Sequence, residues 1–369
     1  MSIGKLGLYI HIPYCNSKCG YCSFYSVVGS ELEKKNYVNA MLKEIELEHG
    51  VFCGTELDTI YFGGGTPSCL PKGAISKILK AVRGHYKVDE NCEITLEVNP
   101  ESCSDELVFE CEKANINRIS IGLQSDDDKL LKKIERGHSY RDFEGALNKF
   151  LKSSITNISV DLMSGLPGQT KKEFKETVEK ISSLPIKHIS IYGLTVDEGT
   201  PFHEKNIQTN QDEQADFYDI TVDLLEKKGF SRYEVSNFAQ KGYHSRHNSK
   251  YWNDSNYLAL GIYASSFFDG IRKKCTSSME NYLNNVFLYE KNLLTKSDRI
   301  FENVMLGLRV SNGIDLKKMK NDFDYDLIKA KKTNIETLIS KGLLVHEGGF
   351  LRCSKGAFYL LNSIILELI

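Results

Sequence analysis

The 369 residues include 47 lysines and arginines against 49 aspartates and glutamates, giving a formal net charge of −2 at pH 7. No long run of either charge occurs, so the chain lacks the basic patch that nucleic-acid binding requires. No apolar stretch reaches the length of a signal-peptide core at the N-terminus or of a membrane span elsewhere. We therefore expect a cytoplasmic protein whose ten cysteines are free thiols or metal ligands rather than disulfides.

Short apolar segments rich in Val, Ile and Tyr alternate with segments of helical spacing in the first half of the chain. The pattern predicts six strands, at 6–13, 57–65, 93–100, 118–125, 157–167 and 188–196. It predicts helices at 34–48, 71–86, 105–115, 142–153 and 171–184. Because alternating strands and helices form parallel βαβ units, the fold class is α/β. Six units instead of eight predict an incomplete parallel (β/α)6 barrel of the TIM type, open on one side.

The alternation of predicted strands and helices ends, and a different pattern begins, at about residue 285. Helical segments there are followed by a helix, two short strands around a Gly-Gly turn and a last helix, in "KGLLVHEGGFLRCSKGAFYLLNSIILELI". This order predicts a small, winged-helix-like α/β domain. We therefore divide the chain into a partial barrel at 1–285, with an extension over about 200–285, and a C-terminal domain at 286–369.

Polar and glycine-rich motifs lie at or directly after the ends of predicted strands. The first four strands lead into "CNSKCGYC", "GGGTP", "EVNP" and "GLQS". In parallel barrels the carboxyl ends of the strands face one common mouth. We therefore expect these motifs to meet in space.

Three cysteines, Cys15, Cys19 and Cys22, fall within eight positions of the first motif. They could be small buried apolar residues, but loop thiols without a role invite oxidation. A closed zinc site needs four ligands, and a second pair of Cys or His at close spacing is absent near this loop. An iron–sulfur cluster of four irons bound by three cysteines would leave one iron with an open position.

The CxxxCxxC spacing, followed by an aromatic residue at the end of a first strand, resembles the cluster loop of radical S-adenosylmethionine (SAM) enzymes. The resemblance implies that Cys15, Cys19 and Cys22 bind a [4Fe-4S] cluster whose open iron is chelated by SAM. It also implies the SAM contacts. The residues assigned to SAM on this resemblance are Tyr9, Tyr21, Gly64, Gly65, Thr66, Glu97, Gln124, Arg136, Asp161 and Thr195.

The chemistry of several of these residues suits that ligand. Glycines let the backbone approach an ammonium group closely, and an arginine such as Arg136 can hold a carboxylate through two hydrogen bonds. Taken alone, Arg136 is better explained by a surface ion pair. The order and spacing of the polar residues, however, are similar to the branch that contains the oxygen-independent coproporphyrinogen oxidases.

Two kinds of protein share this branch, and the sequence differs from one of them. Oxidases resemble CxxxCxxCxC, whereas Phe24 stands at the position of the fourth cysteine and only fourteen residues precede Cys15. The segment "HNSKYW" instead resembles the HNxxYW motif of the haem chaperones of the branch. This resemblance implies that His247 binds haem, with Tyr251 and Trp252 beside it.

An imidazole can ligate haem iron, and aromatic rings can pack on a porphyrin. On chemistry alone, a hydrogen-bonded histidine in an aromatic core explains His247 better than haem binding does, and it is the resemblance that favours haem. Ser265 departs from the branch, because relatives often have a histidine at this position.

We therefore expect a haem chaperone that binds a [4Fe-4S] cluster, SAM and haem, and transfers haem to an acceptor protein. A reductant would serve the cluster. The alternative is a radical SAM oxidoreductase acting on a tetrapyrrole, like the coproporphyrinogen oxidases. The sequence leaves open whether SAM is cleaved, and therefore whether the protein is an enzyme, and whether it forms a homodimer.

Overall fold

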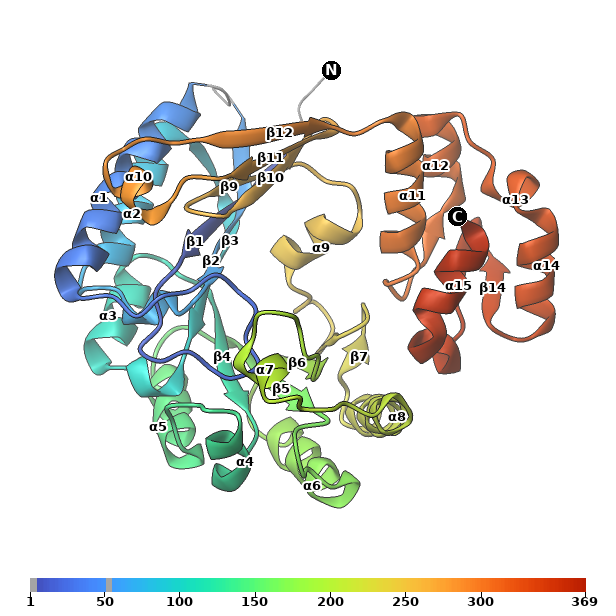
Figure 1. Cartoon of the computed structure of the whole chain (residues 1–369), viewed down its shortest axis with the longest axis horizontal. Helices are drawn as coiled ribbons and strands as arrows, with labels where there is room; N and C mark the ends of the chain where they lie inside the picture. Colours follow the sequence, from blue (N-terminus) through green and yellow to red (C-terminus); the bar gives the residue numbers. More distant parts are fainter. Residues whose placement is uncertain (1–4, 51–54) are drawn as a thin grey trace.

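Six parallel strands alternate with helices through the first half of the chain, as the sequence pattern predicts (Figure 1). The computed structural model describes residues 5–50 and 55–369. The six strands are β1 (Leu6–Ile12), β2 (Glu56–Gly64), β3 (Lys87–Val98), β4 (Arg118–Gln124), β5 (Asn157–Ser164) and β6 (His188–Gly193). Each pairs in parallel with the next, which confirms the predicted partial barrel.

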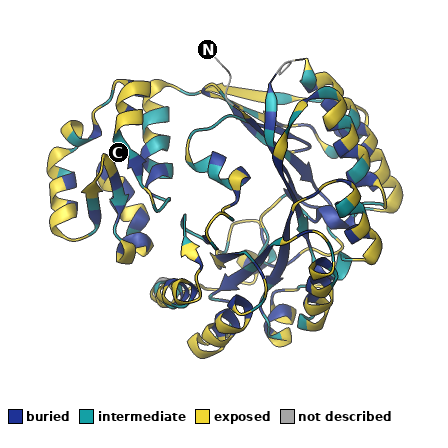
Figure 2. Cartoon of the chain, turned by 180° about the vertical axis from the view of Figure 1, so that it is seen from behind, coloured by how far each residue is buried: buried dark blue, intermediate teal, exposed yellow. Residues whose placement is uncertain are grey.

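Helices cover the outer face of this sheet, and Figure 2 shows buried strands behind helices whose outer sides are exposed. They are α1 (Glu31–His49), α2 (Ala74–His85), α3 (Asp105–Lys113), α4 (Asp128–Lys133), α5 (Tyr140–Leu151) and α6 (Lys171–Ser182). Five of the six match predicted helices, and the short α4 does not. Helix α5 shows why the pattern works: it begins at a Ser139 capping box and buries Phe143, Leu147 and Phe150 on one face.

The sheet continues beyond the six parallel strands at both edges. On one side β9 (Tyr257–Leu260) pairs in parallel with β1. Antiparallel β10 (Ser265–Phe268), β11 (Ile271–Cys275) and β12 (Tyr289–Leu293) follow it. On the other side β8 (Asn237–Ala239) pairs with β6, and β7 (Ser231–Arg232) is the edge strand. The order runs from β12 to β7 without closing, so the barrel is open.

Further helices and short turns connect these strands. They are η1 (Pro67–Cys69), η2 (Pro100–Ser102), α7 (Pro201–Glu204), α8 (Gln211–Lys227), α9 (Arg246–Trp252) and α10 (Met279–Leu283). Helix α9 lies between the sheet and the C-terminal part of the chain (Figure 1). Of the helices in the described ranges, none combines the length and apolarity needed to cross a bilayer.

The C-terminal part folds around a separate hydrophobic core. Its elements are α11 (Lys296–Gly307), β13 (Ile314–Asp315), α12 (Leu316–Phe323), α13 (Leu327–Ala330), α14 (Lys332–Ser340), β14 (Leu344–Glu347), β15 (Phe350–Cys353), η3 (Lys355–Leu360) and α15 (Leu361–Leu368). The predicted helix, hairpin and last helix are confirmed. The two hairpin glycines have φ of 59° and 82°, a conformation that favours glycine. The large sheet runs on to Leu293, past the predicted division at 285.

Candidate cofactor site

The three cysteines lie in the loop between β1 and α1, and the neck of this loop is fixed by backbone hydrogen bonds. The amide of Cys15 donates to Val27, at 3.0 Å, and the amide of Val27 donates to Pro13, at 2.8 Å. Between these anchors the amide of Cys22 donates to Cys19, at 3.2 Å. These hydrogen bonds therefore fix both ends of the loop, which projects from the mouth of the barrel and carries all three thiols.

Two polar side chains from other parts of the chain donate to these thiols. The Thr66 hydroxyl lies 3.4 Å from Sγ of Cys15, and Nη1 of Arg136 lies 3.5 Å from Sγ of Cys19. Nε of Arg136 is buried without a partner among the described residues. Hydrogen-bond donors aimed at sulfur stabilise thiolate ligands and tune the metal group that they hold.

Three cysteine thiols in one loop are the kind of donor set that a four-iron cluster takes from a protein. Within residues 5–50 and 55–369, no three His, Cys, Asp or Glu side chains are grouped to hold one metal ion. A four-iron cluster gives each thiolate its own iron, so the sulfur atoms need not converge on one point. The residues present therefore fit a [4Fe-4S] cluster with three cysteine ligands.

A fourth thiol, Cys69, lies close to the loop but has a different role. Its Sγ donates to the carbonyl of Tyr14 at 3.4 Å, and burial raises its pKa to about 11. Cys69 is thus held as a neutral thiol at neutral pH. All nine cysteines of the described residues are free, and Cys53 lies outside those residues.

The glycine motif after β2 holds the cysteine loop against the sheet. The amides of Gly65 and Thr66 donate to the carbonyls of Ile12 and Tyr14, at 2.8 and 2.7 Å. A β-carbon on Gly65 would lie only 2.7 Å from the Tyr14 oxygen, which is why the residue is glycine. The motif thus extends the pairing of β1 and β2 into the cysteine loop.

Asn99, after β3, is a central residue that the sequence analysis did not select. Its Nδ2 donates to Thr66 and to Glu101, both at 3.1 Å, and its Oδ1 accepts from Nη2 of Arg136 at 3.0 Å. Asn99 thereby fixes both side chains that donate to the cysteines. The sequence signal that could have identified Asn99 is its place in the "EVNP" motif, directly after a strand.

Gln124 and Arg136 meet beside Gly122 of β4. Nη2 of Arg136 donates to the carbonyl of Gly122 at 2.7 Å. A β-carbon built on Gly122 would lie 3.1 Å from Nε2 of Gln124 and 3.0 Å from Nη2 of Arg136. Gln124 has a positive φ of 69° at an irregularity in the pairing of β4 with β5. The bulge aims its side chain at the same place as Arg136.

Glu97 is the centre of a second group, inside the barrel. The Tyr61 hydroxyl donates to its Oε1 at 2.7 Å. Burial raises the pKa of Glu97 to about 7, with the charge of Asp161 acting in the same direction. Burial likewise raises the pKa of Asp161, whose carboxylate accepts from the Ser120 hydroxyl at 3.1 and 2.9 Å. These carboxylates are suited to accepting hydrogen bonds from a ligand.

Tyr9 joins this second group, while Tyr21 lies beside Cys19 and Arg136, and Thr195 lies apart from both groups. The ring of Tyr9 stacks on Tyr61, with centroids 6.2 Å apart. Tyr21 packs edge-on against Phe202, at 6.4 Å. Thr195 is exposed in the loop after β6. Their assignments to SAM remain predictions.

His247 of the HNxxYW motif is fully buried, on the side of α9 that faces the sheet. Its Nδ1 lies 2.8 Å from the Thr59 hydroxyl, and its Nε2 lies 2.9 Å from the Tyr251 hydroxyl. The His247 amide donates to Glu93 at 3.0 Å, and the ring stacks on Tyr61 at 5.2 Å. Both ring nitrogens are therefore engaged inside the protein.

Burial lowers the pKa of His247 to about 3, and the charges of Lys250 and Arg118 act in the same direction. The imidazole is thus neutral, with one nitrogen donating and the other accepting. Trp252, at the end of the same helix, instead lines a cavity of about 330 Å³ next to the C-terminal domain. The HNxxYW motif therefore places His247 against the sheet and Trp252 at the cavity next to the C-terminal domain.

Two other positions singled out from the sequence lie outside this arrangement. Phe24 is 66% exposed, beyond the cysteines. Ser265 is half-buried at the start of β10, opposite Lys274.

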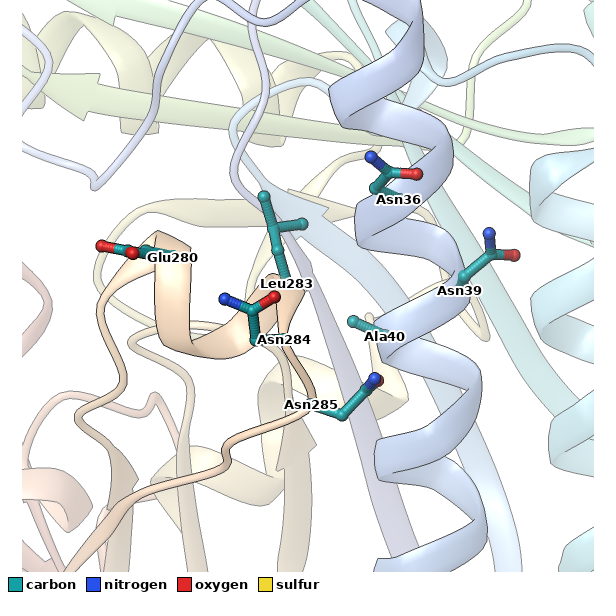
Figure 3. Close-up of a pocket in the computed structure, with 7 residues that line it drawn as sticks. All are labelled: Asn36, Asn39, Ala40, Glu280, Leu283, Asn284 and Asn285. Atoms are coloured by element: carbon teal, nitrogen blue, oxygen red, sulfur yellow. The ribbon is translucent and has the colours of Figure 1, made fainter.

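Figure 3 shows a cavity of about 360 Å³ that also lies apart from the site. It is lined mainly by asparagines of α1 and of the segment after α10, and none of the residues assigned to the cluster, SAM or haem lines it.

The chain is similar to known proteins over most of its length. Residues 9–181 match the model of the radical SAM superfamily, and residues 294–360 match that of the HemN C-terminal domain. The protein named heme chaperone HemW from Lactococcus lactis subsp. lactis is 32% identical, over 96% of this chain and 95% of its own. Its namesake from Bacillus subtilis is 31% identical, over 91% and 92%.

The fold is shared with a solved enzyme structure. Coproporphyrinogen III oxidase (HemN) from Escherichia coli, described as a radical SAM enzyme, superposes with a TM-score of 0.86. The alignment covers 99% of this chain and 90% of that one, at 20% identity, and therefore shows the fold alone.

A partial parallel barrel with three cysteines after its first strand, together with the family match, defines a radical SAM protein. The cofactors of this superfamily are a [4Fe-4S] cluster and SAM. Within it, the chain belongs to the family of the heme chaperone HemW.

Proposed function

We propose that this protein is a haem chaperone, which binds haem and passes it to an acceptor protein while carrying a [4Fe-4S] cluster and SAM. Relatives that bear the name heme chaperone HemW match nearly the whole chain, including the C-terminal domain. A separate reductant would serve the cluster. We place the protein in the cytoplasm, where free loop thiols stay reduced.

Cys15, Cys19 and Cys22 would hold the cluster, which when bound supplies one-electron chemistry and an open iron position. The hydrogen bonds of Thr66 and Arg136 support this assignment, since they hold two of the three sulfurs in place.

The two polar groups of the barrel mouth support the SAM assignments. Arg136 and Gln124 offer donors to the carboxylate and hydroxyl groups of SAM, and Glu97 and Asp161 offer acceptors. The Gly64 and Gly65 backbone lies between these groups and the cysteine loop. Tyr9, Tyr21 and Thr195 complete the proposed set.

One observation links this site to the haem motif. Tyr61 donates its hydroxyl to Glu97, and its ring stacks on His247. If SAM binding changes the hydrogen bonding of Glu97, the change can therefore be transmitted to His247 of α9 through Tyr61. This contact is the structural basis on which we propose that the cofactor site controls haem binding or release.

The sequence assigned haem ligation to His247, with Tyr251 and Trp252 beside it. In this conformation Nε2 of His247 shares a hydrogen bond with Tyr251. Ligation by His247 would therefore require α9 to move away from the sheet.

Haem transfer is the direct test of the proposed function. Anaerobically reconstituted protein is titrated with haem, followed by its Soret band, and is then mixed with an apo-haem protein. We expect stoichiometric binding and transfer that responds to SAM. Failure to bind haem would overturn the proposal. Conversion of coproporphyrinogen III by the same preparation would favour the oxidoreductase alternative.

A further inference from the structure

The loop between β9 and β10 holds an aromatic residue in a backbone conformation that favours glycine. Tyr263 has a φ of 60°, and it is 43% exposed. A positive φ at a residue with a bulky side chain is a strained conformation. Strain of this kind persists only where the surrounding structure imposes it, and it is found most often at functional sites. The conformation therefore points to a role for the exposed Tyr263 ring.

A buried network fixes this loop on α1. Glu44 of α1 is fully buried, and its carboxylate accepts from the amide of Gly261 at 2.8 Å and from the hydroxyl of Tyr282 at 2.6 Å. The amide of Ile262 donates to the hydroxyl of Tyr37, another residue of α1, at 3.2 Å. The exposed ring that follows these two amides is therefore presented from a fixed backbone.

The Tyr263 ring lies against the loop that carries the three cysteines. It packs on the ring of Tyr25, with centroids 4.3 Å apart, and Tyr25 is only three residues after Cys22. In the same loop, Phe24 is 66% exposed and Val28 is 67% exposed. We call Phe24, Tyr25, Val28 and Tyr263 the cluster-loop surface. Exposed aromatic side chains of this kind are enriched in the interfaces between proteins.

Two lysines without acidic partners flank the cluster-loop surface. Nζ of Lys274 lies 5.8 Å from the centroid of the Tyr263 ring. Lys18 lies near Cys22, since its charge opposes the effect of burial, which raises the pKa of that thiol. Both lysines are exposed, and neither forms an ion pair within the part of the chain that the structure describes. Their positive charge would attract an acidic partner and speed its encounter with this surface.

We propose that the cluster-loop surface is the docking site of the reductant, and that the reductant is a small acidic electron-carrier protein. The inference rests on the proposed function, in which a separate reductant serves the cluster. One electron passes from the reduced carrier to the cluster. The carrier is oxidised by one electron, and no bond forms or breaks. A few exposed rings flanked by charges suit electron-transfer complexes, whose interfaces are smaller than about 1,200 Å².

The position of the surface favours a reductant over the haem acceptor. The cysteine loop follows the carboxyl end of β1, and the cluster-loop surface begins two residues after Cys22. The haem motif is on α9, where His247 contacts Thr59 in the first half of β2. A protein docked on the cluster-loop surface is therefore next to the cluster ligands and away from the haem motif.

The test uses an acidic flavodoxin as the probe, with the reconstituted full-length protein. Calorimetry measures the binding of oxidised flavodoxin, and anaerobic mixing with reduced flavodoxin measures the rate of cluster reduction. We expect the double variant Lys18→Glu/Lys274→Glu to weaken binding and slow reduction about tenfold or more at low salt. The rate for the wild type should fall as salt is added. The double variant Lys317→Glu/Lys341→Glu makes the same change of charge at exposed lysines of the C-terminal domain and should behave like the wild type.

Two further variants test the aromatic part of the surface. Phe24→Ala and Tyr263→Asn should weaken flavodoxin binding about fivefold or more, since each removes an exposed ring. Asparagine tolerates a positive φ, so the stability of Tyr263→Asn in urea should change little. Dithionite, a small reductant that needs no docking site, should reduce the cluster of every variant as fast as that of the wild type.

The outcomes separate this inference from the proposed function. If dithionite reduces the wild type but flavodoxin neither binds nor reduces it, the inference is overturned and the proposed function stands. The same conclusion follows if the charge-reversal and aromatic variants bind flavodoxin and are reduced like the wild type. A protein that is reduced through this surface but binds no haem would overturn the proposed function alone. A protein that assembles no cluster would overturn both.

Discussion

The guanidinium group of Arg136 lies against the thiol of Cys19, with Nη1 3.5 Å from Sγ. Its Nη2 is held at 2.7 Å from the carbonyl of Gly122 and at 3.0 Å from Oδ1 of Asn99. A positive charge in this position stabilises a thiolate and favours the more negative, reduced state of a cluster bound there. Arg136 thus joins the cluster ligands to the polar groups assigned to SAM.

Replacing Arg136 should weaken both cofactor functions. We expect Arg136→Ala to lower the reduction potential of the reconstituted cluster and to weaken SAM binding by about 10- to 100-fold, because a charged hydrogen bond contributes about 1.5–3 kcal/mol. Potentiometry and SAM titration measure the two effects. Arg141→Ala, which removes an exposed arginine of α5, is the control. Unchanged potential and SAM affinity in Arg136→Ala would remove this residue from the site.

The two classes of thiol near the loop should respond differently to substitution. Cys15→Ala removes a proposed ligand and should abolish the cluster, seen as loss of iron, sulfide and the visible absorbance. Cys69→Ala removes a neutral buried thiol and should keep the cluster, since its Sγ donates to Tyr14. Loss of the cluster in Cys69→Ala, with the fold intact, would make Cys69 a ligand.

Gly65 should be intolerant of any side chain. The added methyl group of Gly65→Ala would meet the carbonyl oxygens of Tyr14 and Ile12, at 2.7 and 2.9 Å. We expect a loss of about 1–3 kcal/mol in unfolding free energy and a lower iron content, because the cysteine loop is displaced. Gly84→Ala is the matched control: it lies in α2 with open space around it and should stabilise the protein by about 0.5–1 kcal/mol. Equal effects of the two substitutions would contradict the role of the glycine motif.

Glu97 should make the cofactor-free protein less stable as the pH rises. Burial raises its pKa from 4.5 to about 7, so the folded state binds more protons than the unfolded state between these values. The contribution of Glu97 to the free energy of unfolding is fully present below pH 4.5. It is lost as the pH rises through 7, by at most roughly 3 kcal/mol. Glu97→Gln keeps an acceptor for Tyr61 and should reduce this slope in urea denaturation. The part due to Glu234, whose pKa burial also raises to about 7, should remain.

Glu101→Gln is the control for this experiment. Although burial opposes it, the imidazole of His138, with Nδ1 3.4 Å from Oε2, holds the pKa of Glu101 below its usual value. Its effect on stability therefore falls below pH 4.5, and the slope between pH 4.5 and 7 should stay as in the wild type. An unchanged slope in Glu97→Gln would show that the carboxylate is not the titrating group.

Parts of the fold and site could be predicted because their signals are local. Strand and helix periods predicted the six parallel strands, five of the barrel helices and the C-terminal hairpin. The short, largely exposed strands β11 and β12 carry no such period, so their addition to the sheet was not predicted. For Asn99, the motif indicated its place at the mouth of the barrel, but not its hydrogen bonds with Thr66 and Arg136.

The sequence by itself determined the cysteine spacing, the order of elements and the family resemblance, since each depends on residues close together in the chain or on their order. Tertiary structure decided which side chains meet. It placed Arg136 on Cys19 across 117 positions, and it buried His247 while leaving His244 exposed only three residues away. The physical reason is that α9 packs against β2 and β3, far away in sequence, which buries His247 against Thr59 and Glu93, whereas His244 precedes the helix and lies outside this contact.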